Sequence, residues 1–212
     1  WKPIAGAGSA DTFQLDNDAD LERAMAATQH VAECSLEEFI EGDEFTFDTV
    51  SIGGKPAFMN VAQYLPKPLI ARTNEWISPV IVTVRNLEQP ALTGGVALGK
   101  QVLTALNMGD GFTHIEWFSK PSGEVVFGEI GCRPGGAHLV DQMNYTCDID
   151  LFREGARVSC WGSFEAPTTR KYNVAIIFKR AIGQGRITKI TGLREFLRAH
   201  GEYVVESKLL PV

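Results

Sequence analysis

The hydrophobic and polar positions of this chain follow two periods, which together outline its secondary structure. Alternation with a period of two, or a β-branched run, predicts strands. These strands are expected at residues 38–40, 44–50, 51–58, 79–84, 113–118, 124–131, 173–182 and 202–209. Apolar residues at helical spacing predict helices. These helices are expected for about ten residues after an Asp16 or Asn17 cap, and at residues 90–106, 137–145, 148–161 and 193–200.

Residues 62–78 show little periodicity and are expected to form a loop. The loop contains Lys67, Arg72 and Glu75. Each of these side chains is either a solvated surface charge, which is the commoner case, or a group that reaches a functional site. The acids of residues 37–48 are likewise expected to be solvated when they are considered by themselves.

Two glutamates lie on a predicted hairpin formed by residues 113–118 and 124–131, with a tight turn at 120–123. Side chains alternate along a strand, so Glu116 and His114 share one face. With the turn centred on 121–122, Glu116 lies opposite Phe127 and Glu129 lies opposite His114. The two glutamates are then diagonal neighbours, roughly 7–8 Å apart at the backbone.

Carboxylates that close repel each other unless a proton or a cation lies between them. Oxygen ligands at this distance suit Mg²⁺, which commonly takes one or two carboxylates together with substrate phosphates. Arg133 follows directly and is suited to hold an anion. The alternative interpretation is an ordinary surface hairpin whose acids are solvated.

Near the start of the chain, Lys2 precedes a glycine-rich segment that contains Gly6, Gly8 and Ser9. Glycines permit positive φ and let backbone N–H groups approach a phosphate closely, and a serine adds a hydroxyl donor. This segment is a weak signal by itself, because glycine-rich turns are common.

A second glycine-rich stretch, at residues 94–101, nearly matches the phosphate-binding loop G-x-x-x-x-G-K-[ST]. Its last position is Gln101, which has no hydroxyl for Mg²⁺, and no apolar strand precedes it. We therefore assign this stretch to the helix at 90–106, with Thr93 as its expected cap.

Composition mainly excludes classes of function. The 212 residues are enough for a sizeable core in one or two domains, and the net charge of −6 provides no basic surface for nucleic acid. The sequence contains no run of 18 apolar residues and no signal-peptide pattern, so we expect no membrane association. The four cysteines are scattered and are expected to be reduced, cytoplasmic thiols, with Cys132 lining the core.

Four features occur in a fixed order: Lys2 before the glycine loop, E-E-F-I-E-G-D-E at 37–44, H-I-E-W-F at 114–118, and F-G-E-I-G-C-R-P-G-G at 127–136. Together they resemble the ATP-grasp superfamily, in its carboxylate–amine ligase and biotin-carboxylase-like branch, and most closely its amino-acid ligase-like members. The resemblance covers roughly residues 1–160 and implies an α+β fold in which two lobes with antiparallel sheets grip ATP.

The resemblance also implies a division of the chain. Residues 1–40 would be part of the small lobe with the glycine loop, 41–162 the large lobe with the metal hairpin, and 163–212 a small β-rich C-terminal segment. The chain would begin inside the family's ATP-binding unit, so we expect it to be a fragment that lacks the N-terminal domain and is impaired as an enzyme by itself.

The site residues that the resemblance implies fall into three groups. The nucleotide-binding group comprises Lys2, Gly6, Gly8, Ser9, Glu37, Glu38, Phe39, Ile40 and Glu44. Within it, the backbone of Glu38 and Ile40 would bind adenine, and Glu44 would bind the ribose hydroxyls. Glu116 and Glu129 would hold the metal. Arg133 would be the catalytic residue that steadies the transferred phosphoryl group or the substrate carboxylate.

The implied reaction uses ATP and Mg²⁺, with Mn²⁺ as an alternative metal. ATP would activate a small-molecule carboxylate as an acyl phosphate, which an amine then attacks. The alternatives are another ATP-grasp enzyme, either biotin-carboxylase-like or a purine-pathway ligase, and a nucleotide-binding remnant without turnover. Family members often have Asn at the position of Gly131, and they often form dimers. His114, Arg72, Asn144 and Asp141 are the candidates for the substrate pocket.

Overall fold

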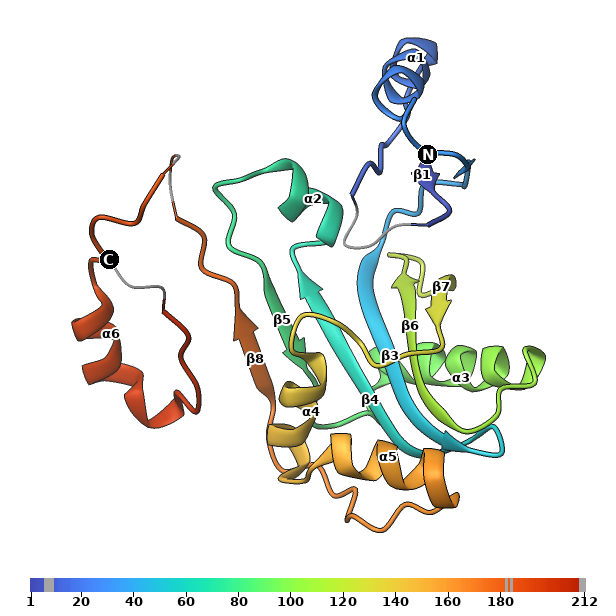
Figure 1. Cartoon of the computed structure of the whole chain (residues 1–212), viewed down its shortest axis with the longest axis vertical. Helices are drawn as coiled ribbons and strands as arrows, with labels where there is room; N and C mark the ends of the chain where they lie inside the picture. The colour runs from blue at the N-terminus through green and yellow to red at the C-terminus, as the bar shows by residue number, and fades with distance from the viewer. Residues whose placement is uncertain (6–9, 182, 184, 210–212) are drawn as a thin grey trace.

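A computed structural model describes residues 1–5, 10–181, 183 and 185–209, and Figure 1 shows its arrangement. Its centre is a six-stranded antiparallel sheet in the order β7-β6-β3-β4-β5-β8. The strands are β3 (Asp43–Ile52), β4 (Lys55–Leu65), β5 (Val80–Thr83), β6 (Gly111–Ser119), β7 (Val125–Gly131) and β8 (Val174–Ile177). The expected α+β architecture with antiparallel sheets is thus confirmed.

The helices are α1 (Asp18–Ala27), α2 (Pro68–Thr73), α3 (Pro90–Ala105), α4 (Leu139–Cys147), α5 (Leu151–Trp161) and α6 (Leu193–His200), followed by the 3₁₀ turn η1 (Gly201–Tyr203). In Figure 1, α3 lies behind the sheet, while α4 and α5 lie in front of its lower part. No helix among the described residues is long and apolar enough to cross a bilayer.

The face of the sheet toward α3 is apolar along most of its length. Its fully buried centre includes Phe47, Ile115 and Trp117, which pack with Leu92 and Leu103 of the helix. This close contact requires glycine on α3. A Cβ at Gly99 would lie 2.2 Å from Phe47, and one at Gly95 would lie 2.2 Å from Trp117. The glycines of residues 94–101 therefore serve helix–sheet packing, and the assignment of this stretch to a helix is confirmed.

The opposite face changes character along the strands. At the end covered by α4 and α5, Val50 and Phe58 pack against Leu139, Met143 and Leu151. Further along the same strands the side chains on this face are polar. They include Glu44, Thr46, Asp48, Asn60, His114 and Glu116. The helices α4 and α5 lie over the apolar part (Figure 1), and the polar part is nevertheless mostly buried, with Thr46, Asp48 and Asn60 at most 1% exposed.

A smaller unit precedes the large sheet. It contains α1 and a two-stranded antiparallel pair, β1 (Lys2–Pro3) with β2 (Cys34–Ser35). Asn17 caps α1, since its side chain accepts a hydrogen bond from the Asp20 N–H. Trp1 Nε1 donates to Thr28 Oγ1 at 3.1 Å, which joins the start of the chain to the end of the helix. In Figure 1 this unit lies above the ends of β3 and β6.

Several local expectations were wrong. Residues 62–78 are not a loop throughout, because β4 continues to Leu65 and α2 follows. Residues 38–40 form no strand. Thr93 does not cap α3, which begins at a proline, and its hydroxyl bonds to the Pro90 carbonyl instead. Asp150 rather than Asp148 caps α5, through the Arg153 N–H.

The C-terminal part is less strand-rich than expected. Only β8 is a strand among the described residues after 163, and it belongs to the large sheet as its edge. Described residues 204–209 form no strand, and α6 has no buried residue. Among the described residues, α6 and residues 204–209 therefore pack against no buried surface, and alternation of side chains without such a surface is not enough to form a strand. The three-part division of the chain stays a prediction.

All four cysteines are free thiols in this structure. Cys132 is exposed, with its Sγ 3.6 Å from the Met108 Sδ, so the expectation that it lines the core was wrong. It follows β7 directly, at a point where the chain has already left the sheet.

Candidate functional site

The β6–β7 hairpin carries two acids whose register differs from the predicted one. Glu116 lies directly opposite Glu129, and Phe127 pairs with Trp117, so the predicted diagonal arrangement was wrong. The difference arises from a β-bulge in which Gly128 is the extra residue of β7. A Cβ at Gly128 would lie 2.9 Å from the Glu116 carbonyl oxygen, so the bulge needs a glycine. It places the two glutamates directly opposite each other on the hairpin, with Cβ atoms about 4.5–5.5 Å apart.

A third acid, Glu44, lies near the start of β3 and is buried, with 8% of its surface exposed. Burial raises its pKa most, the charge of Glu116 raises it further, and Glu129 adds a smaller increase. Lys67 opposes the rise, and the resulting pKa is about 8. Burial thus favours the neutral form of the Glu44 carboxyl, which is not the solvated acid that was expected. Lys67 is close enough for its charge to lower the pKa of Glu44, whereas the sequence did not decide whether this lysine reaches the site.

His114 is buried between two carboxylates. Its Nδ1 lies 2.6 Å from Asp48 Oδ1, and its Nε2 lies 3.4 Å from Glu116 Oε1. Burial lowers the pKa of His114, but hydrogen bonds to Asp48 and Glu116, together with their charges, raise it to about 10. The imidazolium thus donates from both nitrogens. The Tyr64 hydroxyl donates to the same Glu116 oxygen at 3.3 Å, and burial with the nearby acids raises its pKa far above the usual range.

The network continues behind Asp48 into the interior. Asp48 Oδ2 accepts hydrogen bonds from the Thr46 hydroxyl at 2.6 Å and from Asn60 Nδ2 at 3.3 Å. Asn60 Oδ1 in turn accepts from Arg170 at 2.7 Å. Arg170 also donates to the carbonyls of Met59, Val84 and Arg85, and burial lowers its pKa. A continuous path of polar contacts therefore joins the 163–171 linker to Glu116.

Sequence reasoning missed these supporting residues. Asp48 did carry a signal, because it alternates in phase with Glu44 along one predicted strand. Asn60 lies beyond the predicted hairpin partner of that strand, and Tyr64 lies in the stretch expected to be a loop. Arg170 carried no signal, because its role depends on contacts more than 80 residues away in the chain.

Lys2 connects the small N-terminal unit to the hairpin. Its Nζ lies 3.0 Å from Glu37 Oε2 and 3.2 Å from Glu129 Oε2. Burial lowers the pKa of Lys2, but hydrogen bonds to the two glutamates and their charges raise it above its usual value. Burial raises the pKa of Glu37, but hydrogen bonds from Lys2 and Ser35 lower it below its usual value. Three predicted site residues from distant parts of the chain thus meet.

The other predicted nucleotide-binding residues are less closely joined to this cluster. Glu38 and Phe39 are exposed and Ile40 is half-buried, in the segment between β2 and β3. Gly6, Gly8 and Ser9 lie outside the described residues. Their expected role in a glycine loop therefore stays a prediction.

Arg133, the predicted catalytic residue, is exposed just after β7. Its Nη1 donates to the Pro134 carbonyl at 3.0 Å, and none of its contacts among the described residues reaches the acids. Its catalytic role stays a prediction.

The candidates for a substrate pocket separate into different environments. His114 is too buried to meet a substrate directly, at 6% exposure. Asn144 Oδ1 accepts a hydrogen bond from the Leu151 N–H at 2.7 Å, which holds the α4–α5 turn. Asp141 pairs with His138 at 2.9 Å, and Arg72 lies in the last turn of α2. The structure does not bring these four residues together.

The acids fit a divalent cation by the chemistry of their donors. Glu116 and Glu129 are hard oxygen ligands on facing positions, and their negative charge adds to the effect of burial in raising the pKa of Glu44. Among the described residues, no group of three or more His, Cys, Asp or Glu side chains is arranged to hold a metal. A cation here would therefore need oxygen ligands beyond the side chains of the described residues, as phosphates or water would provide.

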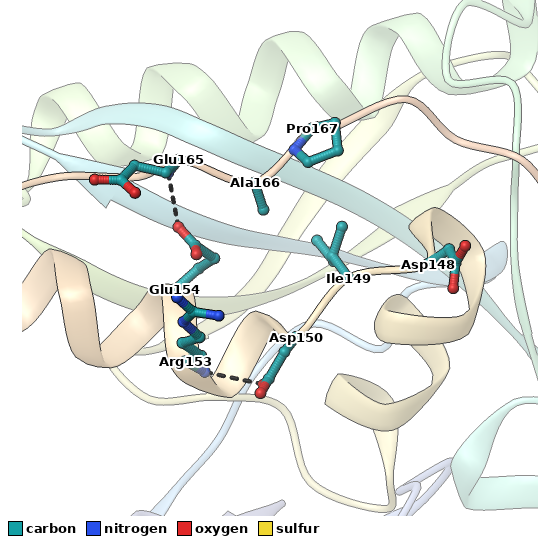
Figure 2. Close-up of a pocket in the computed structure, with 8 residues that line it drawn as sticks. All are labelled: Asp148, Ile149, Asp150, Arg153, Glu154, Glu165, Ala166 and Pro167. Atoms are coloured by element: carbon teal, nitrogen blue, oxygen red, sulfur yellow. Dashed lines mark hydrogen bonds between the residues drawn. The ribbon is translucent and has the colours of Figure 1, made fainter.

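A separate hollow of about 290 Å³ lies at the α4–α5 turn and is lined by the eight residues of Figure 2. Its acids already have structural partners. Asp150 accepts from the Arg153 N–H at 3.0 Å, and Glu154 accepts from the Glu165 N–H at 2.7 Å (Figure 2). The hollow is therefore a by-product of helix capping and not a second candidate site.

Comparisons with known proteins converge on one group of enzymes. No protein-family model matches the chain. It is 24% identical to an L-arginine-specific L-amino acid ligase from Bacillus subtilis, over 97% of this chain and 50% of the relative. The structure of an L-amino acid ligase from Bacillus licheniformis superposes with a TM-score of 0.71 at 20% identity, covering 93% of this chain and 48% of that one.

A biotin carboxylase domain from Hydrogenobacter thermophilus, in complex with MgADP, ADP and bicarbonate, superposes with a TM-score of 0.56. Its identity is 17%, over 83% of this chain and 39% of that one. The chain thus spans about half the length of the curated relative and of the solved ligase that it matches. At these identities the structural likenesses establish the fold, and the sequence match covers nearly all of this chain.

Proposed function

From the premise that this chain has the ATP-grasp fold and is a homologue of an L-amino acid ligase, we propose that it is the nucleotide-binding part of an ATP-dependent carboxylate–amine ligase. The observation that carries the proposal is the pair of directly opposed carboxylates, Glu116 and Glu129, beside the buried carboxyl of Glu44. Such a concentration of acids is suited to a cation that accompanies a nucleotide.

The proposed reaction has two steps, a phosphoryl transfer and an acyl transfer. The carboxylate of the first substrate attacks the γ-phosphorus of ATP, so that an acyl phosphate and ADP form. The amine of the second substrate then attacks the acyl carbon, phosphate leaves, and an amide remains after loss of a proton from the nitrogen. Both substrates are small molecules, and the relatives point to amino acids as their class.

Different residues of this chain would bind different parts of the nucleotide. Glu44 would accept hydrogen bonds from the ribose hydroxyls, or donate its proton to one of them. The backbone of Glu38 and Ile40 would bind adenine in the segment between β2 and β3. Lys2 lies between Glu37 and Glu129, where its charge would meet the phosphates. Arg133 would stabilise the charge on the transferred phosphoryl group.

Glu116 and Glu129 would hold Mg²⁺, which would offset the negative charge of the phosphates. Mn²⁺, a divalent cation that also accepts oxygen ligands, is the alternative. The contribution of the protein is to keep both carboxylates in fixed positions, and the β-bulge at Gly128 does this by placing them opposite each other.

Calorimetric titration of Mg²⁺ with a non-hydrolysable ATP analogue tests this proposal. We expect the wild-type chain to bind the analogue, and Glu116→Ala/Glu129→Ala to lose the part of the affinity that depends on the metal. The matched control is Glu124→Ala, an exposed acid at the turn of the same hairpin, paired with Lys120. Equal metal-dependent affinity in the wild type and the double variant would refute the assignment of the metal site.

The substrate class needs a separate assay. Phosphate release that depends on an amino acid supports the carboxylate–amine ligase. Release that depends on bicarbonate indicates a biotin-carboxylase-like enzyme, and release that depends on a ribonucleotide indicates a purine-pathway ligase. Binding of the nucleotide without phosphate release under any of these conditions indicates a nucleotide-binding protein without turnover.

A further inference from the structure

His114 is the centre of a buried polar network that the proposed reaction does not use directly. The ring is 6% exposed, so it is shielded from a substrate in solution. Toward the site, its polar contact among the described residues is with Glu116 Oε1, at 3.4 Å from Nε2. On the interior side, Nδ1 bonds to Asp48, which is 1% exposed. The ring thus spans the boundary between the interior and the acids.

The geometry around Glu116 is asymmetric. Both His114 and the Tyr64 hydroxyl contact Oε1, at 3.4 and 3.3 Å. Among the contacts of the described residues, none involves the second oxygen, Oε2. The side chain of Glu116 is 25% exposed, whereas that of Asp48 is 2% exposed. One oxygen is therefore held by His114 and Tyr64, and the other has no hydrogen-bond partner among the described residues.

We propose that His114 is a positioning residue: supported by Asp48, it fixes Glu116 Oε1 so that Oε2 is directed to the metal. This inference rests on the proposed function and adds to it the residues that orient a metal ligand. Partners behind a ligand commonly contribute about 10- to 100-fold to metal affinity, because they reduce the number of orientations that the ligand samples.

The rest of the network supports this role. Asp48 is itself fixed by Thr46 and Asn60, and Asn60 is fixed by Arg170, at 2.6, 3.3 and 2.7 Å respectively. A buried ionic network is weak grounds for stability alone, since its desolvation offsets its attraction. Such a network also restrains the orientation of its members. At its end lies Glu116, whose side chain is 25% exposed.

The test measures Mn²⁺ binding in the presence of the ATP analogue, by electron paramagnetic resonance, in parallel with analogue affinity in EDTA. We expect His114→Ala to weaken the metal-dependent affinity about 10- to 100-fold and to leave the metal-free affinity unchanged. We expect His114→Gln, which keeps an N–H donor, to restore most of the loss. The matched control is His30→Ala, which removes the histidine of an exposed pair with Asp11.

Asp48→Asn provides a second test that does not depend on the folding of His114→Ala. Asp48 makes no hydrogen bond to Glu116 among the described residues, so this variant removes the partner of His114 and leaves the ligand itself in place. Because it also removes one negative charge near the site, only a loss of Mn²⁺ affinity greater than about fivefold, the effect of one unit charge at contact distance, indicates an effect through the ring of His114. The inference would be overturned if His114→Ala, His114→Gln and Asp48→Asn all kept the metal-dependent affinity of the wild type. The proposed function would remain intact in that case. Absence of Mn²⁺ and analogue binding by the wild type would instead overturn both.

Discussion

At the scale of single residues, Glu44 shows how burial and neighbouring acids favour the neutral form of a carboxyl group. Its carboxyl is buried at the polar end of the sheet, beside two further acids. Ionisation of all three would place like charges together in a poorly solvated place, so Glu44 keeps its proton up to a pKa of about 8. A cation or a nucleotide that changes the local charge would therefore also change the protonation of Glu44.

Glu44→Gln should change how stability depends on pH. The folded-state pKa is raised from the ordinary 4.5 to about 8, so the folded chain retains a proton that the unfolded chain has released. The free energy of unfolding therefore falls as pH rises from about 4.5 through 8. Glutamine has no such proton, so relative to the wild type we expect the variant to gain about 2–4 kcal/mol between pH 4 and pH 9.

Urea unfolding at several pH values measures this difference. The contribution of His114 to the pH dependence of the free energy of unfolding cancels, because both proteins contain this histidine. The control is Glu41→Gln, an exposed acid shortly before β3, which should follow the wild type at every pH. A pH-independent difference between Glu44→Gln and the wild type would contradict a raised pKa for Glu44.

At the scale of elements, the position of the site depends on how closely α3 packs against the sheet. The strands that carry the acids on one face carry Phe45, Phe47, Ile115 and Trp117 on the other. Because side chains alternate, the packing of the apolar face sets the orientation of the acidic one. Glycines on α3 allow the helix backbone to contact the aromatic rings directly.

Gly99→Ala tests this contact. The new Cβ would lie 2.2 Å from a ring carbon of Phe47, too close for the ring to remain in place. Overpacking costs about 1–3 kcal/mol, whereas alanine adds about 1 kcal/mol through helix propensity. We expect a net loss of stability in chemical denaturation. Thr93→Ala, on the exposed side of the same helix, should change stability by less than about 0.5 kcal/mol.

At the scale of the whole molecule, Lys2 joins two units that are separated in the sequence. It lies in β1 of the small N-terminal unit and reaches Glu129 on the last strand of the hairpin. This ion pair is partly exposed, so we expect it to contribute little to stability. Its expected consequence is electrostatic, because the ammonium group lies 3.2 Å from Glu129 Oε2, where its charge would repel a bound cation.

Lys2→Met should therefore strengthen Mn²⁺ binding in the absence of nucleotide. Removal of a competing unit charge at contact distance is worth about 1 kcal/mol in water, or roughly a fivefold change in affinity. Titration followed by electron paramagnetic resonance measures it. Lys120→Met, which removes a lysine paired with Glu124 at the turn of the same hairpin, is the control. Weaker Mn²⁺ binding in Lys2→Met than in this control would show that Lys2 assists the metal site instead of competing for it.

Local patterns were sufficient for much of the molecule. Period-two alternation, or for β5 a β-branched run, located β3, β5, β6 and β7, and helical spacing located α1, α3, α5 and α6 to within a few residues. Periodicity is a property of neighbouring residues, so it can be read from the sequence. The identity of Glu116 and Glu129 as paired acids on a hairpin followed from the same argument, together with the turn residues between them.

The tertiary structure decided what depends on distant residues. The bulge at Gly128 changed a diagonal pair of glutamates into a directly opposed one, because strand register depends on the backbone of both strands. The burial of Asp48 and His114 and the long reach of Arg170 follow from packing among segments far apart in the chain. The sequence by itself determined which acids are available and which face they share, while three-dimensional packing determined their spacing, their protonation and what holds them in place.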